Sequence, residues 1–209
     1  MAERRPEVYV AGIGQTDVGE LWNVSLRDLA VQAVQAAQKD AGGLKPQAVY
    51  VGNMLAASAA HQANLGALIC EYANLSGSEG ITAEAADASG GAALHLAYNA
   101  IRSGMVDIAL AIGVEKATDV LGSNIDSLSV RNLDADYEAS EGQTPIGQAA
   151  LLMQRYLYEN QFPREALAAF PMLAHSNAVS NPHAMYPKPI KLENYLKSSL
   201  LVEPFNLYD

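Results

Sequence analysis

The sequence contains very little of what several protein classes require. A single cysteine, Cys70, among 209 residues excludes an internal disulfide and a cysteine-ligated metal cluster, and it is typical of a reducing compartment. Basic residues are scarce, with 13 Lys and Arg against 23 Asp and Glu, and the net charge of −10 disfavours binding to nucleic acid or anionic lipid. No apolar run approaches the ~18 residues of a membrane span, and no secretory signal follows Met1. We therefore expect a cytoplasmic protein with neither a membrane segment nor a nucleic-acid partner.

Apolar stretches of strand length alternate with amphipathic stretches of helical period in the first half of the sequence. This alternation predicts an α/β fold in which a mostly parallel sheet is covered by helices on both faces. The expected strands are 8–13, 48–51, 81–86 and 106–114, and the expected helices are 25–41, 62–72 and 88–102. Further helices are expected at 146–160, 164–178 and 192–198. The first of these has Ala149, Leu152, Met153 and Tyr156 at helical spacing, and we expect Met153 and Tyr156 to be core residues rather than cofactor contacts.

The stretch from Ile81 to Gly104 is expected to form a strand, a sharp turn and a helix. Asp87 lies at the turn, where its carboxylate is expected to act as the helix N-cap. The small residues Ser89, Gly90 and Gly91 follow and allow another backbone or a substrate to approach closely. A cysteine at position 87 would be a strong nucleophile, because the helix dipole would lower its pKa.

Several motifs resemble those of the thiolase family. Residues 84–93, Glu-Ala-Ala-Asp-Ala-Ser-Gly-Gly-Ala-Ala, resemble the family's nucleophile segment Glu-Ala-Ala-Cys-Ala-Ser-Gly-Gly-Ala-Ala, and the acylated cysteine falls on Asp87. Residues 113–118, Gly-Val-Glu-Lys-Ala-Thr, are similar to the Gly-Val-Glu-Lys-Met-Ser/Thr motif that closes the following strand. Residues 175–184 resemble the His-x-Asn-Ala-x-x-Asn-Pro-x-Ala segment of the sterol-carrier-protein type of thiolase, a lipid-transfer type.

The resemblance runs from residue 8 to residue 209 and implies a domain organisation. Residues 1–118 correspond to the N-terminal βαβαβ half of a thiolase, 119–199 to its loop and helical subdomain, and 200–209 to the return strand toward the core. A family member is about twice as long. Its second half, absent from these 209 residues, supplies a Gly-His-Pro histidine, a second cysteine and part of an oxyanion hole. The resemblance also implies a homodimer formed through the N-terminal half.

Asp87 is the one candidate catalytic residue. A carboxylate is a much weaker nucleophile than a thiolate toward a thioester, so Asp87 is interpreted either as a general base or as an N-cap without catalytic function. No CoA-binding residues are identified, and Lys188 and Lys191 are candidates for the CoA phosphates only by charge. No metal site is expected, because His175 and His183 are interpreted as capping or packing groups.

Two further interpretations complete the residue predictions. Glu115 and Lys116 are interpreted as a local ion pair and loop anchor, and Cys70, between apolar neighbours, as a small core residue.

The resemblance implies an acyl-CoA-handling subunit of lipid metabolism that makes or breaks a carbon–carbon bond, as an acyltransferase or a retro-aldolase. Coenzyme A enters as a thioester substrate, and no cofactor is bound covalently. The site would be completed by a second chain carrying the missing half, by an OB-fold/zinc-ribbon partner, or by both. Two alternatives stay open. The chain is an inactive scaffold or dimerisation subunit, or it is a fragment or variant of an ordinary acetyl-CoA acyltransferase in which Asp87 is an engineered substitution.

Overall fold

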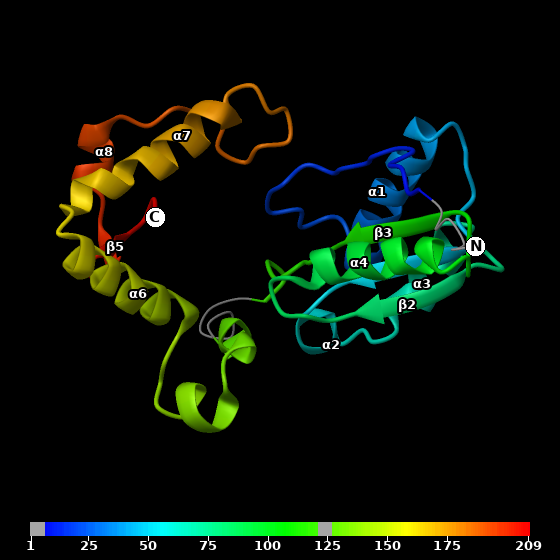
Figure 1. The fold of residues 1–209 in the computed structure, drawn as a ribbon, viewed down its shortest axis with the longest axis horizontal. Helices are drawn as coiled ribbons and strands as arrows, with labels where there is room; N and C mark the ends of the chain where they lie inside the picture. Colours follow the sequence, from blue (N-terminus) through cyan, green and yellow to red (C-terminus); the bar gives the residue numbers. More distant parts are fainter. Residues whose placement is uncertain (1–6, 121–126) are drawn as a thin grey trace, which may run out of the picture. The chain divides into compact units, whose positions relative to one another are not determined.

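The computed structural model describes residues 7–120 and 127–209, and the chain divides into two compact units. The first unit comprises residues 1–16 and 20–128, and the second comprises residues 17–19 and 129–209 (Figure 1). The boundaries expected at residues 118 and 199 from the family resemblance stay a prediction. Among the described helices, none has the length and apolar character of a membrane span.

The first unit is built on a parallel three-stranded sheet. Its strands are β1 (Ala48–Gly52), β2 (Glu79–Ala83) and β3 (Ala109–Gly113), in the order β2-β1-β3. The central strand β1 pairs with both neighbours in one register, so that Gly52 stands opposite Ala83 and Gly113. All five β1 residues are buried, as expected of a strand covered on both faces. The prediction of an α/β fold with a parallel sheet is confirmed.

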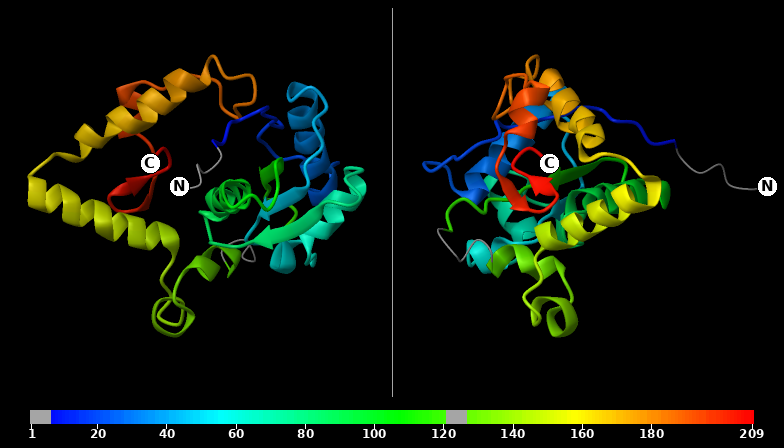
Figure 2. Two further views of the ribbon diagram at one scale, coloured as in Figure 1. Left: turned by 45° about the vertical axis from the view of Figure 1, so that its right-hand side comes forward. Right: turned by 90° about the vertical axis from the view of Figure 1, so that its left-hand side faces the viewer.

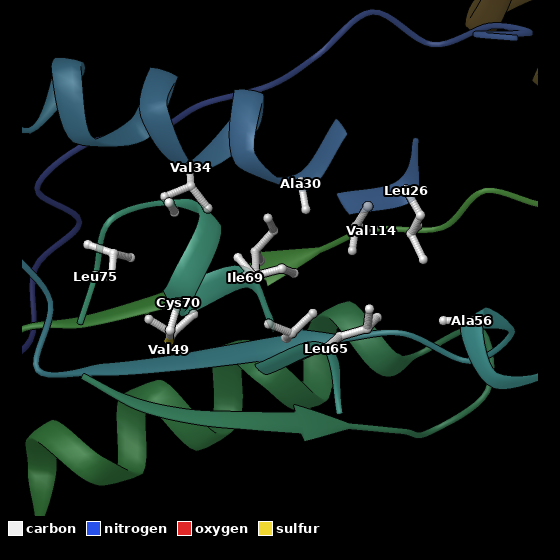
Figure 3. Packing of buried hydrophobic residues seen from close by; sticks show 13 residues of the cluster. Leu26, Ala30, Val34, Val49, Ala56, Leu65, Ile69, Cys70, Leu75 and Val114 are labelled. Carbon is white, nitrogen blue, oxygen red and sulfur yellow. The ribbon is translucent and has the colours of Figure 1, made fainter. Parts of the chain in front are cut away.

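Helices cover both faces of this sheet. On one face, α1 (Leu26–Asp40) and α3 (Leu65–Tyr72) pack over Val49 and Val51, which point to that side of β1. Figure 3 shows side chains of this cluster between α1 and the sheet. On the other face, α4 (Ser89–Arg102) packs small residues against Ala48 and Tyr50 of the same strand. A short helix, α2 (Ala56–Ala59), follows β1.

The ends of α1 are set by local sequence, as predicted. The Ser25 hydroxyl accepts a hydrogen bond from the Asp28 amide, which satisfies one of the free donors of the first turn. At the other end Gly42 and Gly43 both have positive φ, a conformation that glycine adopts without steric cost.

The strand predicted at 8–13 is wrong for the described residues. The segment lies along α1, where a Cβ on Gly14 would overlap the backbone of Ala33 and Ala37. The amide of Ile13 donates to the carboxylate of Asp40 instead of to another strand. Tyr9 and Ile13 are exposed. A strand forms only where a second backbone edge offers free donors and acceptors, and a helix offers none along its side.

The second unit is mainly helical. It contains two short turns, η1 (Val130–Asn132) and η2 (Ala135–Ala139), and then α6 (Pro145–Asn160), η3 (Arg164–Ala168), α7 (Ala169–Ala178) and α8 (Leu192–Leu196). It ends in an antiparallel hairpin of β4 (Leu200–Val202) and β5 (Phe205–Asn206). Both views in Figure 2 show the hairpin between α6 and α7.

Two predictions for this unit are wrong. The helix expected over 164–178 is interrupted, because η3 is a 3₁₀ turn and regular helix begins only at Ala169. Met153 and Tyr156 of α6 were expected in a core, yet Tyr156 is exposed, Met153 is half-buried, and Ala150 alone of the α6 residues is buried. Helical spacing predicts an apolar face correctly, but only a neighbouring apolar surface can bury it.

Candidate functional site

Position 87 lies in the turn that joins β2 to α4. The strand ends at Ala83 and the helix begins at Ser89. The strand predicted at 81–86 therefore begins two residues earlier, at Glu79, and ends three residues earlier. Within the turn, Ala86 has a φ of 48°, in the left-handed region. This conformation costs an L-residue about 1–2 kcal/mol, so surrounding contacts must hold it.

The predicted N-cap role of Asp87 is wrong. The N-cap position of α4 is Ala88, and its methyl side chain makes no capping hydrogen bond. Asp87 precedes it by one residue and is exposed. Asp87 therefore lies one residue before the N-cap, close to the positive end of the α4 dipole.

Ser89 connects the first turn of α4 to the residues before Asp87. Its hydroxyl accepts a hydrogen bond from the Ala85 amide at 3.0 Å and donates one to the Ala86 carbonyl at 2.6 Å. The Ser89 amide also donates to the Ala86 carbonyl, at 3.1 Å. The side chain is buried, so water does not compete for these bonds. Sequence reasoning treated Ser89 only as a small residue and missed this role.

Glycines allow α4 to approach the ends of the strands closely. A Cβ on Gly52, the last residue of β1, would overlap the carbonyl oxygen of Ser89 and lie 2.7 Å from the Gly90 nitrogen. A Cβ on Gly113, the last residue of β3, would lie 3.5 Å from the Cα of Gly90. The turn that carries Asp87 is thus pressed against the carboxyl ends of the sheet strands.

Asn53 ties the ends of all three strands together. It follows β1 directly, and its amide donates to the Ala83 carbonyl at the end of β2. Its side-chain amide donates to the Val114 carbonyl, just after β3, at 2.7 Å, and its side-chain oxygen accepts from the Ala56 amide of α2 at 2.8 Å. The residue is buried. The only sequence signal for this role is an amide residue placed directly after a buried strand.

The carboxylate of Glu115 anchors the loop after β1, as predicted. One oxygen accepts from the Asn53 side chain at 2.9 Å, and the other accepts from the Met54 and Leu55 amides at 3.0 Å each. The predicted ion pair with its neighbour is wrong, because Lys116 pairs with Asp119. The Lys116 side chain is nearly fully buried, so this pair retains a charge that would otherwise be costly to bury.

Both histidines singled out in the sequence lie in the second unit. The His175 ring packs edge-on against Tyr208, with centroids 5.8 Å apart, and its Nδ1 lies 3.0 Å from the Lys188 carbonyl oxygen. His183 Nδ1 lies 2.8 Å from a carboxylate oxygen of Asp17. A packing role is confirmed for His175. His183 has a carboxylate partner that sequence spacing did not reveal, because Asp17 is 166 residues away.

Within the described ranges, 7–120 and 127–209, no group of three or more His, Cys, Asp or Glu side chains has the arrangement of a metal site. Cys70 is buried in the core cluster as predicted, and burial raises the pKa of its thiol. Both lysines belong to the second unit, where Lys191 is the N-cap residue of α8 and the Lys188 carbonyl oxygen lies beside the His175 ring.

Residues that follow the three parallel strands therefore meet at one edge of the sheet, where α/β proteins commonly place their sites. Asn53, Asp87 and Glu115 follow β1, β2 and β3, respectively. The Asn53 side chain and the Glu115 carboxylate make hydrogen bonds that hold the loop after β1. Asp87 is exposed, as is Glu115, and an exposed carboxylate on a rigid turn can accept a proton from a substrate.

Comparison with protein families gives one match over most of the chain. The family model "Thiolase, N-terminal domain" matches residues 8–195. Curated proteins that are similar along nearly the whole chain include the following three. The acetyl-CoA acetyltransferase of Methanocaldococcus jannaschii is 40% identical over 96% of this chain and 51% of its own length. The corresponding protein of Methanothermobacter thermautotrophicus is 38% identical over 97% and 53%. Benzoylsuccinyl-CoA thiolase subunit BbsB of Thauera aromatica is 29% identical over 96% and 51%.

Solved structures share the fold over a similar range. The Ltp2-ChsH2(DUF35) aldolase has a TM-score of 0.69 at 23% identity, covering 95% of this chain and 50% of its own. Acetyl-CoA acetyltransferase from Syntrophomonas wolfei has a TM-score of 0.71 at 19% identity, covering 94% and 58%. The chain thus spans about half the length of the curated relatives that it matches.

Proposed function

Because the chain belongs to the thiolase family, we propose that it handles acyl-CoA thioesters and contributes position 87 to a site that breaks or forms a carbon–carbon bond. One observation carries the proposal. The turn that bears Asp87, inside the segment resembling the family's nucleophile motif, is held at the carboxyl edge of the sheet by hydrogen bonds of the buried Ser89 side chain. Such pre-organisation of an exposed carboxylate is what general-base catalysis requires.

The carboxylate favours a retro-aldol reaction over acyl transfer. Acyl transfer through Asp87 would require a mixed anhydride, which water hydrolyses, whereas aldol cleavage needs no acyl-enzyme. In the proposed reaction Asp87 accepts the proton of a β-hydroxyl group on a β-hydroxyacyl-CoA. The Cα–Cβ bond then breaks, its electron pair passes into the thioester enolate, and the hydroxyl carbon leaves as a carbonyl. Protonation of the enolate at Cα gives the shortened acyl-CoA, and the reverse sequence forms the bond.

A second chain is proposed to complete the site. The curated relatives are about twice as long as this chain, so their remaining half has no counterpart among these residues. Two of the similar proteins have names that include a further component, a DUF35 protein in the aldolase and a subunit designation in BbsB. We propose that a partner of this kind, or a chain carrying the other thiolase half, supplies the group that stabilises the enolate.

The test begins with native mass spectrometry of the complex isolated through this chain. Co-purification of a second chain is expected, and the complex should cleave a β-hydroxyacyl-CoA. We expect Asp87→Ala to lower the cleavage rate by about 10²–10⁴-fold, the usual contribution of a positioned general base. The melting temperature should stay nearly constant, because Asp87 is exposed. Asp107→Ala, which changes another exposed aspartate of the same unit, should leave the rate unchanged.

The alternatives correspond to other results of the same test. Full cleavage activity in Asp87→Ala would rule out the general-base role. A complex without acyl-CoA cleavage would favour a scaffold subunit. The curated relatives named as acetyltransferases favour testing Asp87→Cys as well. Acetyl transfer gained by that variant would identify the chain as part of an ordinary acyltransferase altered at this position.

A further inference from the structure

We propose that Ser89 is the positioning residue of the site, because it holds Ala86 in the left-handed conformation that sets the direction of residue 87. This inference rests on the proposed function only in taking position 87 as the reacting position. Ser89 itself is not placed in contact with a substrate.

The hydrogen bonds of the Ser89 hydroxyl and amide go to the two residues that precede Asp87 by one and two positions. The hydroxyl takes the Ala85 amide at 3.0 Å and gives its proton to the Ala86 carbonyl at 2.6 Å, while the Ser89 amide reaches the same carbonyl at 3.1 Å. Together these bonds close a ring across the turn. The φ of 48° at Ala86 lies inside this ring.

The contact of Glu84 with the turn is less protected. The Glu84 carboxylate accepts from the Ala86 amide at 2.5 Å, but both atoms belong to an exposed contact, where water competes. Ser89 is only 5% exposed, and its backbone is backed by Gly52 of β1. The Ser89 hydroxyl therefore fixes the turn relative to the sheet, whereas the exposed Glu84 carboxylate has no such contact with β1 among the described residues.

A thiol introduced at position 87 provides a readout that is independent of catalysis. The full chain with Asp87→Cys, together with any chain that co-purifies, is labelled with iodoacetamide across a range of pH, and the labelled peptides are quantified by mass spectrometry. Cys70 gives the baseline in the unmodified chain, because it is buried and should react slowly. Held at the start of α4, the introduced thiol should have a pKa about one unit below the ordinary ~8.5.

Removal of the Ser89 hydroxyl should release the turn. In Asp87→Cys/Ser89→Ala, labelling at neutral pH is expected to fall about three- to tenfold, and the pKa of the introduced thiol should return toward ~8.5. The matched control is Asp87→Cys/Ser103→Ala, since the Ser103 hydroxyl donates to the Ala100 carbonyl at the other end of the same helix. This control should label like the parent.

Rescue by glycine separates positioning from general stability. Glycine adopts positive φ freely, so adding Ala86→Gly to Asp87→Cys/Ser89→Ala should recover most of the lost labelling. If Ser89→Ala prevents folding, recovery of the fold by Ala86→Gly supports the proposal and failure to recover it overturns it. A lower melting temperature with an unchanged labelling profile in Ser89→Ala also overturns it.

The two proposals fail separately. A labelling shift that depends on Ser89 in a complex without acyl-CoA cleavage would reject the proposed function and keep the positioning role. Cleavage that depends on Asp87, with labelling indifferent to Ser89, would do the reverse.

Discussion

Gly52 shows how a single residue sets the geometry of the candidate site. It ends the central strand β1, and the first turn of α4 lies directly against its backbone. The missing side chain is what allows the contact, because its φ lies outside the left-handed region and needs no glycine for that reason. Close approach of two backbones is therefore the function of this glycine.

We predict that Gly52→Ala destabilises the protein by about 3 kcal/mol or more, because the added Cβ would overlap the backbone of Ser89, which cannot move as a side chain could. Gly91→Ala is the control. No atom lies within 4 Å of a Cβ at that position on α4, so alanine should raise stability by up to about 1 kcal/mol through its higher helix propensity. Urea denaturation measures both changes. Equal effects at the two positions would contradict the close contact.

At the scale of elements, a buried polar network joins α8 to the C-terminal hairpin. Tyr195 of α8 is fully buried, and its hydroxyl donates to the Asp209 carboxylate at 2.7 Å. The other oxygen of that carboxylate accepts from the Asn206 amide of β5 at 2.8 Å, and the Asn206 side chain returns to the Tyr195 carbonyl at 3.3 Å. Burial and the Asp209 carboxylate raise the pKa of Tyr195 to about 12.

Because of this network, the free energy of unfolding is expected to fall as the pH rises into the alkaline range. The pKa of Tyr195 in the folded chain, about 12, exceeds the ordinary value of 10, so the unfolded state loses its proton first. The stabilisation is complete below pH 10 and is lost as the pH rises toward 12. Between pH 9 and pH 11 the unfolding free energy of the wild type should fall by about 1.4 kcal/mol more than that of Tyr195→Phe.

The exposed Tyr158 supplies the control for this measurement, because Tyr158→Phe removes a hydroxyl without removing a buried contact. Its stability should follow the wild type between the two pH values in urea titrations. Parallel pH dependence of the wild type and Tyr195→Phe would show that the phenol is not the group responsible.

At the scale of the whole molecule, β2 forms one edge of the described sheet. The order β2-β1-β3 leaves one side of β2 without a partner among the described residues, and four of its five residues are exposed or half-buried. Open strand edges favour pairing with another chain. The family resemblance implies a homodimer formed through the N-terminal half, so we propose that two copies pair through β2.

We therefore predict a dimer at micromolar concentration in sedimentation experiments, and dissociation to monomer in Ile81→Lys. Ile81 is in the middle of β2 and 37% exposed, so lysine should disturb the edge more than the interior. Leu44→Lys changes an apolar residue of similar exposure, 42%, outside the sheet, and should remain dimeric. A monomeric wild type, or equal behaviour of the two variants, would exclude pairing through this strand.

The local sequence was sufficient to predict several elements of the fold and the turn around Asp87. The α1 boundaries follow from Ser25 and the Gly42-Gly43 pair, and β1 and α4 follow from apolar runs of the right length. The turn around Asp87 was located because small residues interrupt the apolar pattern there. These features depend on neighbours within a few residues along the chain, which is why periodicity and capping rules detect them.

The contacts that hold the turn were decided only in three dimensions. No sequence feature near Asn53 predicts Ala83 and Val114 as its hydrogen-bond partners. None near Asp17 predicts its contact with His183. The hydrogen bonds of the Ser89 hydroxyl to Ala85 and Ala86 were missed although they are local, because an N-cap at Asp87 was an equally good interpretation of the same residues. A side chain with two hydrogen-bonding roles has no single sequence signature.

The sequence by itself determined the alternation of strands and helices, the family resemblance and the placement of an acid at position 87. Only the tertiary structure decided that β1 stands between β2 and β3, that residues 8–13 form no strand, and that the apolar face of α6 is exposed. The physical reason is the same in each case. Helical and extended conformations depend on the chain's own neighbours, whereas strand pairing and burial depend on which surfaces meet, and those surfaces are supplied by residues far away in the chain.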